Sequence, residues 1–161
     1  VAIVDIYSRM ILDYEISNTL DAEFCIRCLE RTIKKYGAPV VFNSDQGVQY
    51  TCTEWINVLH QHEIMISMDG KGRWADNVWI ERIWLTIKYE CIHLAGIENL
   101  LELKSELSAY ILYYNNRRLH SSLGYKQPAK YYENSMQKNW AQDYLVYCEL
   151  DKKVANTKEA A

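Results

Sequence analysis

Two acidic residues and a lysine are the first candidates for chemistry in this sequence. Asp45 stands in the polar stretch that follows an apolar run at residues 40–42, and Gly47 frees the backbone around it. A carboxylate presented at the end of a buried strand is placed for function. Glu81 lies inside a helical pattern, and Lys88, seven residues later, falls on the same helical face. Each also has a simpler explanation, because Asp is common in turns and helical Glu and Lys are usually surface residues.

The elements that must hold these residues follow from hydrophobic periodicity. We expect hairpin strands at residues 1–7 and 10–16, a helix at 20–36, a strand at 40–42, a helix at 51–63, a strand at 64–68, and helices at 76–92 and 98–114. Asn18 or Thr19 can cap the first helix, and Asp76 or Asn77 the third. This order indicates an α/β domain whose mixed sheet carries helices on its faces and polar loops at its strand ends.

Bulk properties restrict the class of protein. The 161 residues are 49% hydrophobic, which suits one domain with a buried core. No apolar run approaches the roughly 18 residues that span a bilayer, so we expect a cytosolic protein with no membrane partner. A net charge of −3 argues against nucleic-acid binding over the whole surface. Any contact with DNA is therefore expected to be local.

Cysteine and tryptophan need separate consideration. Five cysteines are an odd set that argues against a disulfide framework. Cys25 and Cys28 have a metal-like spacing, but they fall on the apolar face of a predicted helix and no second pair matches them, so we interpret them as core residues. Trp74, Trp79 and Trp84 recur at intervals of five, which cannot be one helical face. Some could be exposed for base stacking, although packing is the commoner fate of Trp.

Several motifs together carry a family resemblance. They are the segments at residues 4–9, 43–50 and 67–72, with Asp76, Asn77 and Glu81. Since 81 − 45 = 36, there are 35 residues between Asp45 and Glu81. In these features the chain resembles the transposases of insertion sequences and the retroviral integrases, which share a ribonuclease-H-like core and an Asp, Asp, Glu triad. The resemblance covers nearly all of residues 1–133, and we expect residues 134–161 to be a C-terminal extension that is partly disordered.

The segment at residues 114–125, followed by Gln127, Pro128 and Ala129, is similar to the end of insertion-sequence transposases of the OrfB type. It favours these proteins over retroviral integrases. The resemblance implies DNA transposition by phosphoryl transfer, with two Mg²⁺ or Mn²⁺ ions about 4 Å apart. Asp45 and Glu81 would be catalytic and would ligate metal, since hard cations prefer carboxylate oxygens. A donor DNA end would be cleaved, and its 3′-hydroxyl would attack target DNA.

The same resemblance indicates partners and contacts. Transposon ends and target DNA are the expected partners, in a transpososome built from several copies of the chain, within a bacterial cytoplasm and at the nucleoid when DNA is bound. Cations near the Glu81 helix and in the basic stretch at residues 117–130 would contact phosphate. The DNA-binding candidates are Lys88, Arg73, Arg82, Arg117, Arg118 and His120. As an alternative, such basic runs are usually solvated, and an isolated His is more often a surface group.

The first carboxylate of the family lies on a strand that precedes the one at which this sequence opens. We therefore expect an N-terminally truncated core that lacks the family's first strand. Asp5 lies on the following strand and is not expected to replace that ligand. One hypothesis is a transposase core that acts once the first strand is supplied. Another is an inactive remnant that binds DNA or partner subunits, and a ribonuclease-H-type nuclease ranks below both.

Overall fold

The computed structural model describes residues 1–68 and 78–135, apart from the side chain of Trp79. Arg73, Trp74, the expected helix caps at residues 76 and 77, and nearly all of the expected C-terminal extension lie outside this part. The described elements are β1 (Ala2–Val4), β2 (Ile11–Tyr14), α1 (Glu23–Tyr36), β3 (Val41–Ser44), α2 (Val48–Thr51), α3 (Thr53–Gln61), β4 (Met65–Met68), α4 (Val78–Ile87), the π-helical turn η2 (Lys88–Ile92), α5 (Leu100–Asn116), the 3₁₀ turn η3 (Ser121–Leu123) and α6 (Pro128–Ser135).

The hairpin of β1 and β2 is antiparallel, as predicted, with Ala2 opposite Tyr14. Its turn is held by a side chain, because the Asp5 carboxylate accepts hydrogen bonds from the backbone N–H of Ser8, at 2.7 Å, and from the Ser8 hydroxyl. Ser8 is fully buried in this position. The next residue, Arg9, has a φ of 64°, the left-handed conformation that closes the turn.

Strands β3 and β4 are parallel, with Val41 opposite Met65 and Ser44 opposite Met68. Parallel strands need a crossover, which α2 and α3 provide here. The sequence pattern predicted one helix at residues 51–63. Two helices form instead, because Cys52 between them has an extended backbone with ψ of 153°.

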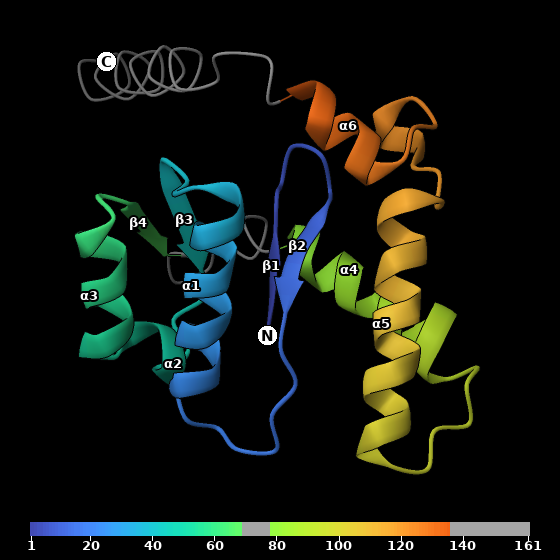
Figure 1. Ribbon diagram of the computed structural model, residues 1–161, viewed down its shortest axis with the longest axis horizontal. Coiled ribbons are helices and arrows are strands. Elements are labelled where there is room, and N and C mark those ends of the chain that lie inside the picture. Colours follow the sequence, from blue (N-terminus) through green and yellow to red (C-terminus); the bar gives the residue numbers. More distant parts are fainter. Residues whose placement is uncertain (69–77, 136–161) are drawn as a thin grey trace, which may run out of the picture.

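The predicted combination of parallel and antiparallel strands is confirmed, but the strands do not join into one sheet. Within the described residues they form two two-stranded sheets, β1 with β2 and β3 with β4. Across the molecule the strands follow the order β4, β3, β1, β2, so that β3 and β1 are the inner strands (Figure 1). Strand β3 forms backbone hydrogen bonds with β4, and β1 forms them with β2. In the described structure no such hydrogen bonds join β3 to β1, so the sheet is interrupted between these two strands.

Helix α1 holds the two sheets together. Its residues Cys28 and Leu29 are almost completely buried and share a core with Ile3 of β1. Phe42 of β3 and Ile66 of β4 pack against the same core. Apolar burial on one helix thus replaces the hydrogen bonds that a continuous sheet would supply. The helix begins at Glu23 rather than at residue 20, and no side chain caps it, so the caps predicted before it are wrong.

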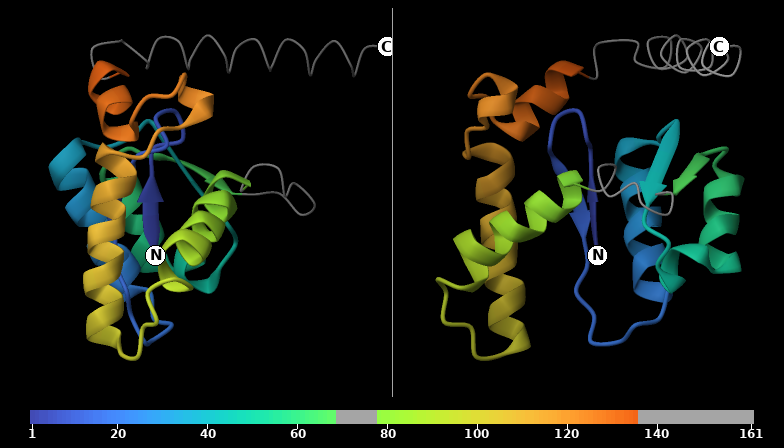
Figure 2. Two further views of the ribbon diagram at one scale, coloured as in Figure 1. Left: turned by 90° about the vertical axis from the view of Figure 1, so that its right-hand side faces the viewer. Right: turned by 180° about the vertical axis from the view of Figure 1, so that it is seen from behind.

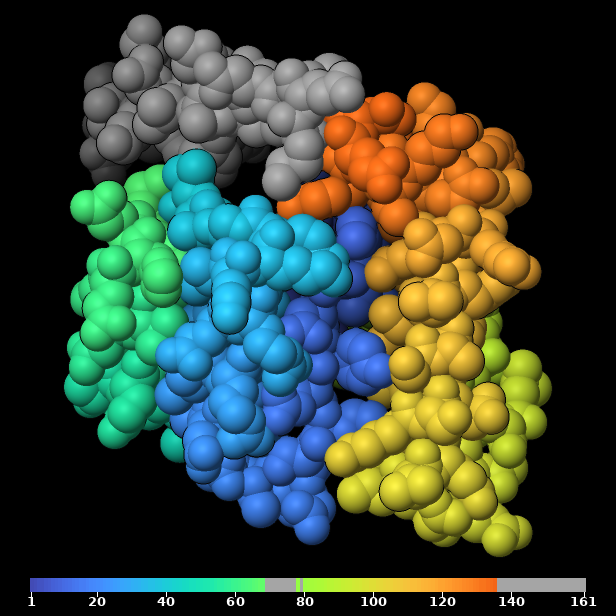
Figure 3. All heavy atoms as spheres, viewed as in Figure 1, coloured from blue at the N-terminus to red at the C-terminus, as the bar shows by residue number. Residues whose placement is uncertain are grey.

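A second core lies between the hairpin and helices α4 and α5. Ile11 of β2 is buried there with Ile87 of α4 and Ile111 of α5. Helix α4 crosses the side of the molecule that faces away from α1 (Figure 2). In the space-filling view, α1 and α5 stand on either side of the hairpin (Figure 3).

Helix α5 begins at a good cap, since the Asn99 side chain accepts hydrogen bonds from the backbone N–H groups of Leu101 and Glu102. Helix α6 was not predicted. It begins at Pro128, a residue suited to the first helical position because it has no N–H to leave unpaired. No helix in the described part combines the length and apolarity needed to cross a membrane.

Candidate metal and DNA site

Asp45 is the first residue after β3 and is exposed. Its Oδ1 accepts a hydrogen bond of 2.8 Å from the backbone N–H of Gly47. The backbone of Gly47 approaches Asp45 so closely that a Cβ at position 47 would lie 2.8 Å from the same oxygen. Glycine is therefore favoured by lack of space, since its φ of −58° is open to any residue. The backbone therefore orients the carboxylate while leaving it open to solvent.

Glu81 lies in the first turn of α4 and is also exposed. Lys88 follows two turns later, at the start of η2, and is exposed on the same face. Among the described ion pairs, none includes Glu81 or Lys88. Both charges are thus available to a ligand on this side of the helix.

The carboxylate oxygens of the two candidate ligands suit a hard cation, but two carboxylates are fewer than a metal centre needs. Asp45 and Glu81 offer carboxylate oxygens, which Mg²⁺ and Mn²⁺ prefer. Within the described residues, however, no three His, Cys, Asp or Glu side chains gather where one metal ion could bind, and no hydrogen bond or ion pair joins the two acids. Asp5 is engaged in the hairpin turn with Ser8. These residues therefore fit part of a metal centre.

Arg118, a predicted DNA contact, is paired inside the protein. Its Nε and one terminal nitrogen donate to the two carboxylate oxygens of Glu90 at 2.9 and 2.6 Å, and the Tyr110 hydroxyl donates to Glu90 at 2.7 Å. The Arg118 and Tyr110 hydrogen bonds lower the pKa of the Glu90 carboxyl against the opposing effect of burial. This cluster joins η2 to α5 and to the loop that follows it, and no local sequence pattern indicated it.

His120 lies beside the same cluster. Burial lowers the pKa of its imidazole, and the neighbouring Arg118 charge lowers it further. The ring meets Tyr114 edge-on with centroids 4.9 Å apart, and its backbone forms an isolated β-bridge with Lys126. Its Nε2 is buried and makes no hydrogen bond within the described structure. His120 is therefore half-buried and its cationic form is disfavoured, whereas a phosphate contact calls for an exposed cation.

The other predicted DNA contacts differ in their surroundings. Arg117 is exposed at the end of α5. Arg82 is exposed on α4 and lies close to Arg9. Burial lowers the pKa of the Arg9 guanidinium, and the Arg82 charge adds to that shift. The two arginines place positive charge where α4 meets the hairpin turn.

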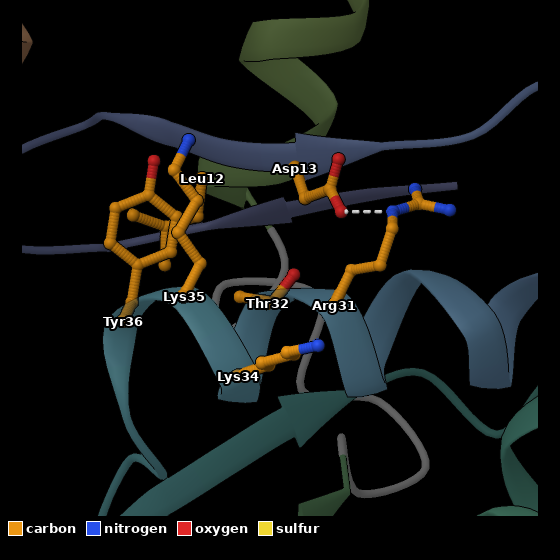
Figure 4. Close-up of a pocket in the computed structure, with 7 residues that line it drawn as sticks. All are labelled: Leu12, Asp13, Arg31, Thr32, Lys34, Lys35 and Tyr36. Carbon is orange, nitrogen blue, oxygen red and sulfur yellow. Dashed lines mark hydrogen bonds and ion pairs between the residues drawn. The ribbon is translucent and has the colours of Figure 1, made fainter.

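A groove of about 490 Å³ lies elsewhere, between β2 and the C-terminal half of α1. Figure 4 shows Lys34, Lys35 and Tyr36 around it, with Arg31 paired to Asp13. None of the candidate catalytic residues lines this groove. The lysines also fit a structural role, since cations at a helix C-terminus stabilise its dipole.

The interpretation of Cys25 and Cys28 as core residues is confirmed. Both are buried in α1, and burial raises the pKa of the Cys28 thiol to about 12, far from the thiolate form that binds metal. The cysteines in the described part of the chain are free.

Comparison with known proteins agrees with this arrangement. Two models of the integrase core domain match residues 1–73 and 62–128. A protein of insertion sequence element IS150 from Escherichia coli is 33% identical over 131 residues, which are 80% of this chain and 46% of the relative. The transposase for insertion sequence element IS904 from Lactococcus lactis is 34% identical over 128 residues, covering 78% and 51%. The chain belongs to the integrase-core family of insertion-sequence transposases. It spans about half the length of these relatives.

Solved structures show the same fold. The catalytic core domain of BIV integrase matches with a TM-score of 0.70 and 18% identity, over 86% of this chain and 88% of that one. The HTLV-2 integrase catalytic core, solved in complex with magnesium, matches with a TM-score of 0.61 and 18% identity, over 78% and 77%. The predicted ribonuclease-H-like fold is therefore confirmed.

Proposed function

We propose that this transposase chain carries Asp45 and Glu81 as two metal ligands of a DNA-cleaving and strand-joining site. The observation that supports it is the exposure of both carboxylates, Asp45 directly after β3 and Glu81 in the first turn of α4, outside the described ion pairs. The helix holds Glu81, and the end of β3 together with the Gly47 N–H holds Asp45. The family membership of the chain and its fold support the same assignment.

In this proposal the protein groups position the reactants. The Gly47 N–H fixes one oxygen of Asp45, and so sets the direction from which the carboxylate approaches a cation. Lys88, on the same face as Glu81, would hold a phosphate of the donor DNA end. Two Mg²⁺ or Mn²⁺ ions, when bound to a complete ligand set, would activate the attacking oxygen and stabilise the leaving oxygen.

The partners belong to the same proposal. Transposon ends and target DNA are the substrates, and several copies of the chain act together; the HTLV-2 integrase core, which has the same fold, has been solved in a dimeric form. The reaction takes place in the bacterial cytoplasm, at the nucleoid. For phosphate contacts we favour Lys88 and Arg117, which are exposed, over Arg118 and His120, whose polar groups are engaged or buried.

A strand-cleavage and strand-transfer assay with Mg²⁺ tests the proposal. It compares this chain with a form extended upstream by a strand that bears the first Asp, on DNA that carries the ends of the encoding element. We expect activity in the extended form and its loss in Asp45→Asn and Glu81→Gln. Glu106→Gln, at an exposed acid of α5, is the matched control and should remain active. An extended form that binds DNA but never cleaves it would instead support the inactive remnant.

Metal binding gives a second measurement that needs no turnover. Mn²⁺ titration followed by electron paramagnetic resonance should show weaker binding after Asp45→Asn than after Glu106→Gln. Equal binding by these two variants and the unchanged chain would contradict the assignment of Asp45 as a ligand.

A further inference from the structure

The exposed face of α4 contains more than charged groups. Ile83 and Ile87 are buried on the inner side of the helix, 5% and 1% exposed. Trp84 is 42% exposed and lies between Glu81 and Lys88, three residues after one and four before the other. Residues three and four apart are neighbours on a helix surface. Carboxylate, indole and ammonium therefore form one continuous stripe.

A second exposed aromatic group follows Lys88 in η2. Tyr89 is 62% exposed, and its ring stacks on His93 with centroids 5.4 Å apart and planes at 17°. The π-helical turn that begins at Lys88 is an unusual local structure, of the kind often found at functional sites. Exposed rings thus precede and follow Lys88 along the chain, Trp84 on the same face of the helix and Tyr89 on the adjoining face.

The exposure of Trp84 contrasts with the burial of Trp55 in the same fold. Trp55 is fully buried and makes edge-to-face contacts with Phe42 and Tyr50, at centroid distances of 5.4 and 5.1 Å. A large ring that is left at the surface is more informative than a buried one, because its apolar area remains in contact with water. Trp84 therefore has area available for a partner.

Charge decides between two kinds of partner. The core of a protein interface is depleted in lysine, whereas binding of a single nucleic-acid strand combines cations for the backbone with rings for the bases. Lys88 is exposed within the stripe, the nearby acid Glu90 is paired with Arg118, and the remaining acid of the stripe, Glu81, is the proposed metal ligand. The combination fits a polyanion that has flat groups.

We infer that Trp84 stacks on an unpaired base of a DNA strand whose adjacent phosphate is held by Lys88, with the Tyr89–His93 pair as a second stacking surface. This inference rests on the proposed function for its choice of DNA. It adds that the site recognises bases that have left the duplex, next to the carboxylate proposed as a metal ligand. Stacking needs neither a metal ion nor a third carboxylate, so it can be tested on the chain as it is.

The test uses a thymidine oligonucleotide about eight nucleotides long and an abasic strand with the same number of phosphates. Binding is measured by fluorescence anisotropy at about 50 mM salt, without metal. The unchanged chain should prefer the strand with bases. Trp84→Ala should lose about 5- to 100-fold of the affinity for that strand and little for the abasic one, since stacking contributes about 1–3 kcal/mol per base. Trp84→Phe should keep most of the preference.

Two further variants separate base from phosphate and from general effects. Lys88→Gln should weaken both strands alike and lower the slope of log affinity against log salt by about one. Tyr113→Ala, at an exposed aromatic of α5, is the matched control and should bind like the unchanged chain. Circular dichroism spectra of all variants establish that each is folded.

Equal affinity of the unchanged chain for both strands, or an unaffected preference in Trp84→Ala, would overturn the inference. So would a change of oligomeric state in Trp84→Ala, seen by sedimentation, with DNA binding intact, because the face would then be a protein interface. Failure of the proposed function has a different signature. It would appear as missing cleavage in the extended form, whether or not the base preference depends on Trp84.

Discussion

Asn115 of α5 closes the edge of the hairpin and provides the sharpest test of the fold. Its Oδ1 accepts a hydrogen bond of 3.0 Å from the Ile11 backbone N–H, and its Nδ2 donates one of 2.8 Å to the Ile11 carbonyl oxygen. Asn115 is 7% exposed and Ile11 is 2% exposed, so water cannot replace these contacts. One side chain thus pairs with the β2 backbone as a neighbouring strand would.

Asn115→Ala removes both hydrogen bonds and leaves the N–H and C=O of Ile11 buried without partners. Each lost bond costs about 1 kcal/mol, and an unsatisfied buried group costs about 1–3 kcal/mol. Partial relaxation makes these costs overlap, so we expect the free energy of unfolding to fall by about 2–4 kcal/mol. For a domain of this size the corresponding decrease in melting temperature is about 6–12 °C.

The adjacent Asn116 offers a matched control. It is exposed, and its Nδ2 donates to the Leu112 carbonyl oxygen in the same helix. Asn116→Ala should change the free energy of unfolding by less than about 0.5 kcal/mol, because alanine favours the helix. Urea unfolding followed by circular dichroism measures both variants. If the two substitutions had equal effects, or if Asn115→Ala cost less than about 0.5 kcal/mol, the reasoning would be refuted.

Two other predictions concern the site. Glu90→Gln should lower the free energy of unfolding by about 1 kcal/mol at neutral pH, a modest value because the ion pair with Arg118 is partly exposed. Since folding lowers the pKa of Glu90, this cost should shrink once the pH falls below the ordinary pKa of Glu, about 4.3. Urea unfolding at several pH values measures the cost, and a cost that grows in acid would contradict the prediction. Gly47→Ala should weaken Mn²⁺ binding with little loss of melting temperature, because the added Cβ displaces Asp45 Oδ1; unchanged binding would exclude this close approach.

Much of the fold could be predicted because its signals are local. Periodicity located α5 and β4 to within about two residues, and the family motifs identified the ribonuclease-H-like core. The helix starts were less predictable, since no side chain caps α1, and α6 was missed because its short sequence lacks a long apolar pattern. The break at Cys52 is a single change in backbone angle that periodicity does not detect.

For the candidate site, the sequence by itself indicated the family and predicted two carboxylates. The interval from Asp45 to Glu81 and the flanking motifs are properties of chain order, and they need no folding to be visible. Asp5, although acidic and near the hairpin, could be assigned to the turn only from its contacts with Ser8.

Tertiary structure alone decided which polar side chains have hydrogen-bond or ion-pair partners inside the protein. Arg118 pairs with Glu90, 28 residues earlier, and Asn115 pairs with Ile11, 104 residues earlier. Adjacent residues of one type, such as Asn115 and Asn116, are alike in composition but point about 100° apart around a helix, so one reaches the buried hairpin edge and the other reaches solvent. Such pairings depend on which elements pack together, and packing is a property of the whole chain that local spacing does not contain.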